Sequence, residues 1–298
     1  MIFKIIFISV FIILFIYSIF RPFHSIISRL FLMIGSILGV FSLIGVTYAQ
    51  NVADFLGIGR AADLYLYLSL VTIFLFVSSQ SLVAAGYIAT YSLNVSNPAA
   101  YVKAMDDLME SDWGKAFPAV VNLHQYVFNG YDDATHTVVL NYEDTESLGK
   151  GTESFSSPVF QKFLAKTSEF AEPVEQSLNM KLISGGNYEP ENNQVYTVYR
   201  MKVDDAAAYA KAYSKVTKAQ EEAGNVAGSY GLRAQMGGSV NYYTHYAFTG
   251  AGSMTEAMQS AETLYSSDSF AEFSKEVDGN RDIRNISIIQ TVKVYNSN

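Results

Sequence analysis

The chain has 298 residues, of which 50% are hydrophobic and only 16% are charged, and its net charge is −8. An ordinary soluble domain carries roughly 25% charged residues, so this composition indicates a chain that lies partly in a membrane. The acidic balance excludes a nucleic-acid-binding surface, which needs a concentrated basic face, and the absence of cysteine excludes disulfides, thiolate metal ligands and a cysteine nucleophile.

The first part of the chain is nearly uncharged. Residues 1–85 have a net charge of +2, which leaves −10 for the remainder. Within this part, three apolar runs cover residues 2–20, 30–48 and 64–85, and the only charged residue in them is Lys4. Each run is close to the roughly 20 residues that cross the hydrocarbon core as a helix. We therefore predict an all-α transmembrane region of three helices in the bacterial inner membrane, with the lipid bilayer as a partner.

Charged residues flank these runs. Arg21 and Arg29 make a basic loop between the first two runs, and the positive-inside rule places that loop in the cytoplasm. Arg60 and Asp63 precede the third run three positions apart, a spacing that allows a pair on one helical face. We predict that these four residues lie at the membrane interface. Three crossings then place residues 86–298 in the cytoplasm.

The third run supports two interpretations. No basic residue follows it until Lys103, whereas Arg60 precedes it, so the local charges place its C-terminal end outside. The small residues Val83, Ala84 and Ala85 also suit signal-peptidase cleavage. Residues 64–85 are therefore either the last span of an anchor or a cleaved export signal, and the two halves of the chain are either a natural fusion or joined segments.

The loop Gly57-Ile58-Gly59-Arg60-Ala61-Ala62-Asp63, placed after two apolar spans, resembles small three-span bacterial membrane proteins of unknown function. These proteins are often encoded beside glycosyltransferases for envelope polysaccharides. The resemblance covers about residues 1–80 and ends where this chain continues into a long domain. It implies that residues 64–85 are a span, which favours a cytoplasmic over a periplasmic domain, and it implies a role near envelope synthesis.

The rest of the chain is an internal repeat. Two pairs of segments match in the same order: Val95–Ala104 with Val203–Ala212, and Ser157–Phe163 with Ser267–Phe273. A cluster of Gly, Asn and Pro at residues 185–193 is a linker signal between the copies. We therefore predict two domains, residues 86–186 and 187–298.

Each copy is predicted to have the order β-α-β-β-α-β. Alternating apolar residues predict opening strands at residues 87–95 and 195–203. The other predicted strands are residues 123–128, 137–142 and 180–183 in the first copy, and 228–235, 242–248 and 286–294 in the second. A helix start follows each opening strand, at Pro98 and in the alanine run after Asp205.

This order, with Ser-x-x-Phe-x-x-Phe in both copies, resembles the dimeric α+β barrel of antibiotic-biosynthesis monooxygenases and stress-responsive barrel proteins. The resemblance covers about residues 87–296. It implies that two ferredoxin-like βαββαβ repeats form an intramolecular dimeric α+β barrel, a pseudo-dimer that closes within one chain and leaves no exposed sheet edge.

Candidate site residues follow from the same resemblance, because active members of that family use the cleft between sheet and helices. It implies His124, His245, Asn122 and Tyr246 as catalytic candidates, although a lone histidine on a strand is more often structural. Trp113, Tyr91 and Tyr199 are candidates for an aromatic-lined pocket that takes a small apolar or aromatic ligand. We find no metal-ligand, phosphate-loop or Ser-His-Asp spacing.

The sequence therefore predicts a membrane-anchored binding or accessory protein, without a catalytic set and without a cofactor. Two alternatives stay open. One is a monooxygenase-like or haem-degrading-type barrel enzyme tethered to the membrane. The other is an accessory of envelope polysaccharide or glycolipid synthesis.

Overall fold

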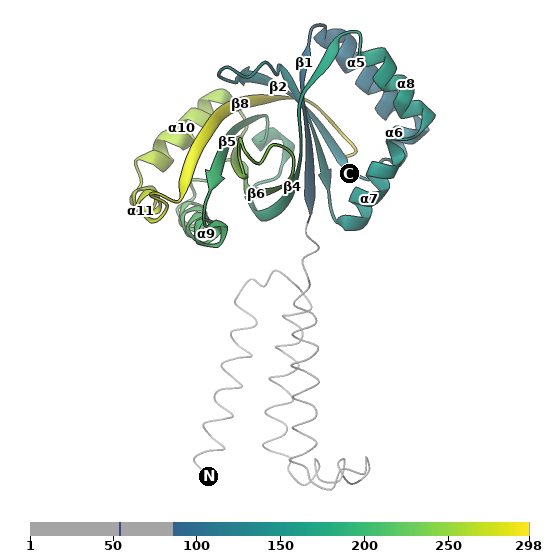
Figure 1. Ribbon diagram of the computed structural model, residues 1–298. Coiled ribbons are helices and arrows are strands. Elements are labelled where there is room, and N and C mark those ends of the chain that lie inside the picture. The colour runs from purple at the N-terminus through teal and green to yellow at the C-terminus, as the bar shows by residue number, and fades with distance from the viewer. Residues whose placement is uncertain (1–53, 55–85, 298) are drawn as a thin grey trace. The chain divides into compact units, whose positions relative to one another are not determined.

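The computed structural model describes residues 54 and 86–297 (Figure 1). The chain divides into two compact units, Met1–Val83 and Ala84–Asn298. The three predicted spans, and with them Arg21, Arg29, Arg60 and Asp63, lie outside the described residues. Within the described part, no helix is both long and apolar enough to cross a membrane.

The first repeat contains four strands and four helices. In chain order these are β1 (Tyr87–Val95), α5 (Pro98–Met109), α6 (Asp112–Ala116), β2 (Val120–Phe128), β3 (His136–Tyr142), α7 (Thr145–Ser154), α8 (Pro158–Thr167) and β4 (Ala171–Gly186). The helix start after β1 is the predicted one: the side chain of Asn97 accepts a hydrogen bond from the amide of Ala100, and Pro98 fills the first turn.

The second repeat follows a short 3-10 turn, η1 (Pro190–Asn192), and has the same order except that one helix stands between its first two strands. Its elements are β5 (Val195–Val203), α9 (Ala206–Glu222), β6 (Ser229–Gly237), β7 (His245–Ala251), α10 (Met254–Tyr265), α11 (Asp268–Glu276) and β8 (Arg281–Tyr295). The matched serines cap matched helices, because Ser157 accepts from the amide of Phe160 and Ser267 accepts from the amide of Phe270.

The eight strands form a closed antiparallel barrel in the order β1-β3-β2-β8-β5-β7-β6-β4. Each repeat supplies four neighbouring strands. The last strand of each repeat then pairs with the second strand of the other, β4 with β6 and β8 with β2. This arrangement confirms the predicted α+β barrel, in which no strand edge is left open.

The closing strands are much longer than predicted. β4 has 16 residues and β8 has 15, whereas the alternation indicated only residues 180–183 and 286–294. The first half of β4 pairs with β1 and the second half pairs with β6, with a register shift in each ladder. Such bulges break the alternation of exposed and buried side chains, so the pattern is lost where the strand continues.

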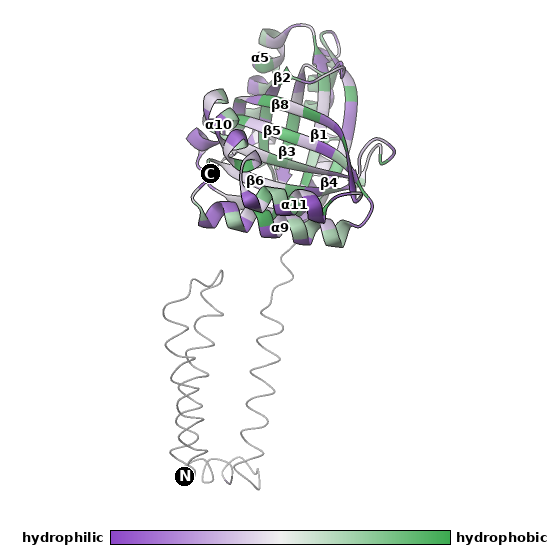
Figure 2. Cartoon of the chain, turned by 90° about the vertical axis from the view of Figure 1, so that its left-hand side faces the viewer, coloured by the Kyte–Doolittle hydropathy of each residue, from purple (hydrophilic) through white to green (hydrophobic). Residues whose placement is uncertain are grey.

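Helices cover the outside of the barrel in two groups, α5–α8 on one half and α9–α11 on the other (Figure 1). A separate apolar core fills each sheet–helix layer. Leu123 and Tyr142 belong to the first core, and Leu232 and Tyr209 to the second. Figure 2 shows both hydrophilic and hydrophobic residues along α9 and α11, as expected of helices that pack one face on a sheet.

Candidate functional site

Three of the cavities formed by the described residues lie against the barrel sheet. The barrel cavity, of about 350 Å³, lies inside the closed sheet and is lined by His124, Tyr196 and Arg233 among others. The first cleft, of about 230 Å³, lies between the sheet and the helices of the first repeat. The second cleft, of about 190 Å³, lies between the sheet and helices α9–α11 of the second repeat.

The first cleft is lined largely by aromatic side chains that stack on one another. The Trp113 ring stacks on Phe117 at 4.9 Å between centroids and on Phe160 at 5.3 Å, and Phe155 stacks on Phe160 at 4.6 Å. Tyr91 meets Phe155 edge to face at 6.4 Å. Two predicted pocket residues, Tyr91 and Trp113, therefore lie in a self-packed aromatic layer.

Helix α6 produces this layer, because it turns Trp113 over the sheet. Gly114 permits the turn: a Cβ at this position would lie 2.3 Å from the Cα of Met109. The indole Nε1 of Trp113 donates to the carbonyl of Ser154 at 3.1 Å and so fixes the ring.

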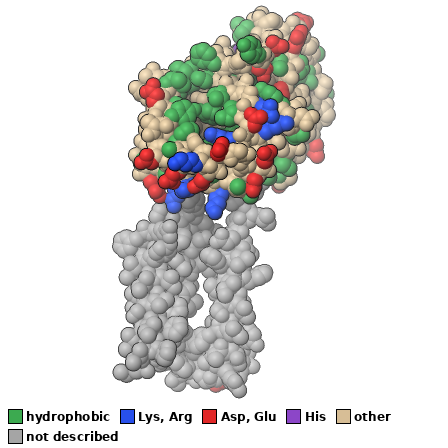
Figure 3. Space-filling view, turned by 60° about the vertical axis from the view of Figure 1, so that its left-hand side comes forward, with side chains coloured by type: hydrophobic (Ala, Val, Ile, Leu, Met, Phe, Trp, Pro, Cys, Tyr) green, Lys and Arg blue, Asp and Glu red, His purple; other side chains and the backbone are tan. Residues whose placement is uncertain are grey.

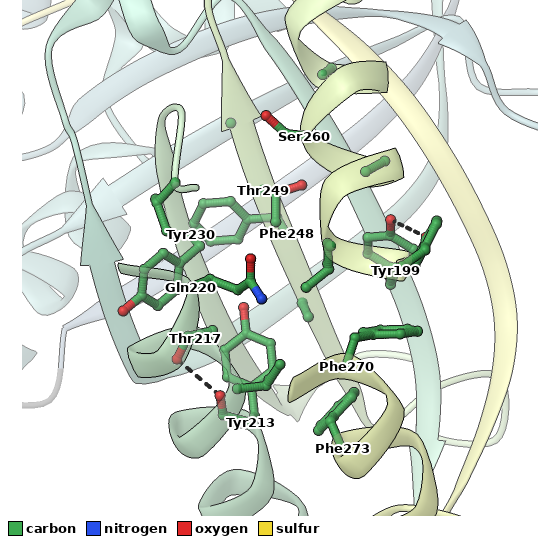
Figure 4. A pocket seen from close by; sticks show the side chains of 18 of the residues that line it. Tyr199, Tyr213, Thr217, Gln220, Tyr230, Phe248, Thr249, Ser260, Phe270 and Phe273 are labelled. Carbon is green, nitrogen blue, oxygen red and sulfur yellow. Dashed lines mark hydrogen bonds between the residues drawn. The ribbon is translucent and has the colours of Figure 1, made fainter. Parts of the chain in front are cut away.

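The second repeat has no counterpart of α6, since α9 is a single helix of 17 residues. Its cleft consequently has no tryptophan over it, and polar side chains enter from several elements (Figure 4). Gln220 reaches in from α9, and its Nε2 donates to the hydroxyls of Ser267 and Ser269 at 3.0 and 2.7 Å. The hydroxyls of Tyr199 and Tyr265 lie 2.8 Å apart on the opposite side.

The walls of the second cleft combine apolar rings with neutral polar groups. Phe270 and Phe273 form one side, and the hydroxyls of Ser260 and Thr249 make no hydrogen bond to another described residue (Figure 4). Burial raises the pKa of Tyr199 well above its ordinary value, so its hydroxyl stays neutral. The same cause raises the pKa of Tyr213.

Arg281 is the one charged side chain that lines this cleft, and it is already engaged. Its guanidinium lies 4.9 Å from the centroid of the Phe273 ring and donates to the hydroxyl of Tyr209 at 3.4 Å. Among the lining residues, all of them described, there is no carboxylate and no imidazole. The second cleft therefore offers hydrogen bonds and apolar contact, and it lacks a general base.

The rim of the second cleft is apolar and exposed. Tyr265 is 51% exposed, Ile286 is 49% exposed and Ile283 is 41% exposed, although all three also line the cavity. Figure 3 shows hydrophobic side chains gathered on the face of the described domain that includes the second repeat, with charged side chains around them. An apolar ligand would thus find contact both inside the cleft and at its entrance.

Three of the four catalytic candidates meet in the barrel cavity, on the other face of the sheet from the predicted cleft. Asn122, His124 and Tyr246 all line it. Side chains alternate along a strand, and on β2 the helix-facing positions are taken by Val121 and Leu123 of the first core. The expectation that these candidates face a sheet–helix cleft is therefore wrong.

His124 is deeply buried in the barrel. Its Nδ1 lies 3.3 Å from the hydroxyl of Thr291, and burial lowers its pKa to about 4. Burial also raises the pKa of Tyr246 to about 12. Both pKa values lie far from neutrality, so at neutral pH His124 is a weak base and Tyr246 a weak acid.

His245, the fourth candidate, lines none of the three cavities. Its Nδ1 lies 3.0 Å from the hydroxyl of Thr244, which in turn accepts from the amide of Val203. The first repeat has the same arrangement, with Thr135 and His136 at 2.9 Å. The repetition in both halves indicates a structural hydrogen bond at a strand start.

Several residues of these sites were not predicted from the sequence, among them Gln220, Tyr213, Tyr230 and Arg233. For Gln220 the sequence does contain an indication. Tyr209, Tyr213 and Val216 define the buried face of α9, and Gln220 continues it at helical spacing. A glutamine on an apolar helix face indicates a polar group turned inward. Arg233 had no comparable signal.

Comparison with known proteins supports the fold alone. No known family model matches the sequence, and no curated protein matches it. A monooxygenase candidate from Fusobacterium nucleatum subsp. nucleatum is 15% identical, with a TM-score of 0.50 over 72% of this chain and 95% of that one. One from Lactobacillus acidophilus NCFM is 10% identical, with a TM-score of 0.48 over 70% and 98%. A mutant chlorite dismutase from Candidatus Nitrospira defluvii is 9% identical, with a TM-score of 0.44 over 70% and 92%.

Proposed function

We propose that this chain is a membrane-tethered binding protein that holds a small, neutral, ring-bearing molecule in the second cleft. The observation that carries the proposal is the difference between the two repeats. The same fold is built twice and the two clefts are of similar size, but their walls differ: stacked rings around Trp113 line the first, while Gln220, Ser260 and tyrosine hydroxyls line the second.

The lining defines the ligand class. The rings of Phe270 and Phe273 favour a flat apolar body, and the hydroxyls of Ser260 and Thr249 favour a ligand oxygen that takes part in hydrogen bonds. A neutral ligand fits best, because the only charged lining residue, Arg281, is held by Tyr209 and Phe273. Membrane spans in residues 1–85 and an apolar rim would both suit a ligand that partitions into lipid.

A barrel enzyme is the weaker candidate. The second cleft has no carboxylate or imidazole among its described lining residues to take a proton. A haem does not fit either cleft, because no histidine or cysteine lines them and burial keeps the tyrosine hydroxyls neutral. A role in envelope polysaccharide synthesis depends on residues 1–80 and stays a prediction.

Titration calorimetry of the full chain in detergent tests the proposal, with menadione, a neutral bicyclic quinone, as the probe. We expect one menadione bound per chain. Ala261→Phe, which fills the cleft from α10, should abolish the binding, and Gln220→Leu should weaken it. Ala165→Phe, on the exposed surface of α8, is the matched control and should bind as the wild type does.

Two results would overturn the proposal. One is binding unaffected by Ala261→Phe, which would place menadione elsewhere. The other is a failure of menadione and of other neutral bicyclic rings to bind at all. Menadione consumption by the purified chain would instead support the barrel-enzyme alternative.

A further inference from the structure

The barrel cavity contains a buried positive charge that no acidic group of the described residues balances. Arg233 lies on β6 and is 4% exposed, yet no Asp or Glu within residues 86–297 forms an ion pair with it. Its Nε has no hydrogen-bond partner in this part of the chain, and its Nη1 donates to the backbone carbonyls of Leu232, at 3.0 Å, and of Ile183. One side of the guanidinium is thus left free.

A second arginine of the same cavity, Arg200, is paired with acidic side chains, as buried arginines usually are. The Nη1 of Arg200 lies 3.1 Å from Glu175 and 3.5 Å from Asp132. Burying an ionised side chain without a counter-charge costs several kcal/mol. The fold pairs Arg200 but leaves Arg233 unpaired among the described residues, and packing alone does not explain this difference.

A second basic residue lies near Arg233. Lys181 lies opposite Arg233 in the β4–β6 ladder, and its Nζ donates to the carbonyl of Tyr142 at 3.1 Å. Burial and the nearby guanidinium lower the pKa of Lys181 to about 8. Lys181 does not line the cavity and has Glu143 near it, so the positive charge that faces the cavity here is that of Arg233.

The position of the guanidinium depends on a glycine. A Cβ at Gly231 would lie 2.5 Å from Nη1 of Arg233 and 2.8 Å from the ring of Phe248. The missing side chain lets the guanidinium lie 5.0 Å from the centroid of that ring, inside the barrel. Tyr246 is the residue on β7 that pairs with Arg233, so the rings of Tyr246 and Phe248 both lie beside the guanidinium.

We infer that the barrel cavity binds an aromatic carboxylate, with the carboxylate on Arg233 and the ring against Tyr246 and Phe248. The guanidinium fork matches the two oxygens of a planar carboxylate. One uncompensated arginine favours a single negative charge, and the cavity of about 350 Å³ has room for a small ring system. Tyr188, which is 60% exposed, also lines the cavity and marks its opening to solvent.

This site does not depend on the proposed function. Arg233 and Tyr246 belong to the inward face of the sheet, whereas Tyr199 and Met201 line the second cleft on its helix face. The two sites also differ in charge, because the second cleft suits a neutral ligand. Failure of one proposal therefore leaves the other standing.

The test is thermal unfolding of the full chain in detergent with benzoate, benzamide or acetate added. We expect benzoate to raise the melting temperature in a saturable way, because a ligand that binds only the folded state stabilises it. Benzamide has the ring without the charge, and acetate has the charge without the ring, so each should give a much smaller shift at equal concentration.

Arg233→Met should weaken benzoate binding by roughly tenfold or more, the usual effect of losing charge-assisted hydrogen bonds. Arg284→Met is the matched control, because that arginine is 38% exposed and lies outside the cavity. If Arg233→Met does not fold, Arg233→Lys keeps a charge without the fork and should still bind benzoate less tightly. Equal shifts from benzoate and benzamide, equal shifts from benzoate and acetate, or unchanged benzoate affinity in the foldable Arg233 variant would each overturn the inference.

Discussion

The guanidinium of Arg200 lies 3.1 Å from the carboxylate of Glu175, and this ion pair joins the second repeat to the first. Arg200 is on β5 and Glu175 is on β4, two strands that are not neighbours in the barrel order. The contact therefore crosses the inside of the barrel. Asp132 lies 3.5 Å from the same guanidinium, and Tyr126, also of the first repeat, accepts a hydrogen bond from it at 3.2 Å.

Arg200→Met should destabilise the chain strongly. Both acidic partners are mostly buried, with exposures of 16% and 17%, and without the guanidinium they become unpaired charges. Removing one partner of a buried pair typically costs about 3–5 kcal/mol of unfolding free energy. Chemical unfolding of the full chain in detergent measures the change. Adding Glu175→Gln to the variant should recover part of the loss, because it removes one of the charges.

The control for this prediction is an exposed ion pair. Lys103 and Asp107 lie 3.2 Å apart on α5, with 74% and 51% of their side chains exposed. Lys103→Met should change the unfolding free energy by less than about 1 kcal/mol. Equal effects of Lys103→Met and Arg200→Met would contradict a structural role for the buried network.

Two glycine-to-alanine substitutions should have opposite effects on stability. Gly114→Ala places a Cβ 2.3 Å from the Cα of Met109, so α6 must move and the Trp113 stack must loosen. Gly149→Ala, within helix α7, meets no atom within 4 Å. The second change should stabilise the fold by about 0.4–1 kcal/mol, since alanine restricts the unfolded chain.

Trp113 is the only tryptophan of the chain, so its emission reports on the first cleft. We expect a lower unfolding midpoint and a shifted emission maximum for Gly114→Ala, and a raised midpoint with unchanged emission for Gly149→Ala. A Gly114→Ala variant with wild-type midpoint and emission would show that α6 does not depend on this close approach.

The repeat and its alternating strands were enough to predict two copies of one strand and helix order, and the closed barrel was what the family resemblance implied. The opening strands at residues 87–95 and 195–203 match β1 and β5, and the duplicated Ser-x-x-Phe-x-x-Phe segments begin matched helices. These features are local in sequence, since period-two alternation and helix caps depend on near neighbours.

The sequence could not predict which side chains of each strand point into the barrel and which point toward the helices, because both faces of the closed sheet are buried. Alternation normally separates a polar, solvated face from an apolar one. Here Asn122, His124 and Arg233 are polar but face the inside of the barrel. The unpaired charge of Arg233 depends on which residues of β4 and β7 lie opposite it, and that register is set by long-range pairing.

Stability should fall as the pH is lowered from about 6.5 to about 4, and His124 should be one cause. Its pKa is about 4 when folded and about 6.5 when unfolded, because burial disfavours the charged ring. In that window the unfolded state binds the proton more readily, so unfolding is favoured as the pH falls. The full shift corresponds to about 3 kcal/mol.

Replacing His124 measures how much of the pH dependence of stability this residue causes. His136 and His245 also have lowered pKa values, caused by burial, and act in the same direction. We expect His124→Gln to lose less stability than the wild type between pH 7 and pH 4.5, as measured by denaturant midpoints at both values. Parallel pH profiles for the two proteins would mean that His124 is protonated in the folded state or remains solvated.

The predicted anchor in residues 1–85 can be tested directly. Three apolar runs of the length of a membrane-spanning helix should keep the full chain in the membrane pellet after alkaline carbonate extraction, which removes peripheral proteins. If the basic loop of Arg21 and Arg29 is cytoplasmic and all three runs cross, a C-terminal tag is protected from protease in intact spheroplasts. Digestion of the tag on a full-length protein would place the barrel domain in the periplasm and contradict three crossings. A shorter, exported product would show instead that residues 64–85 are a cleaved signal.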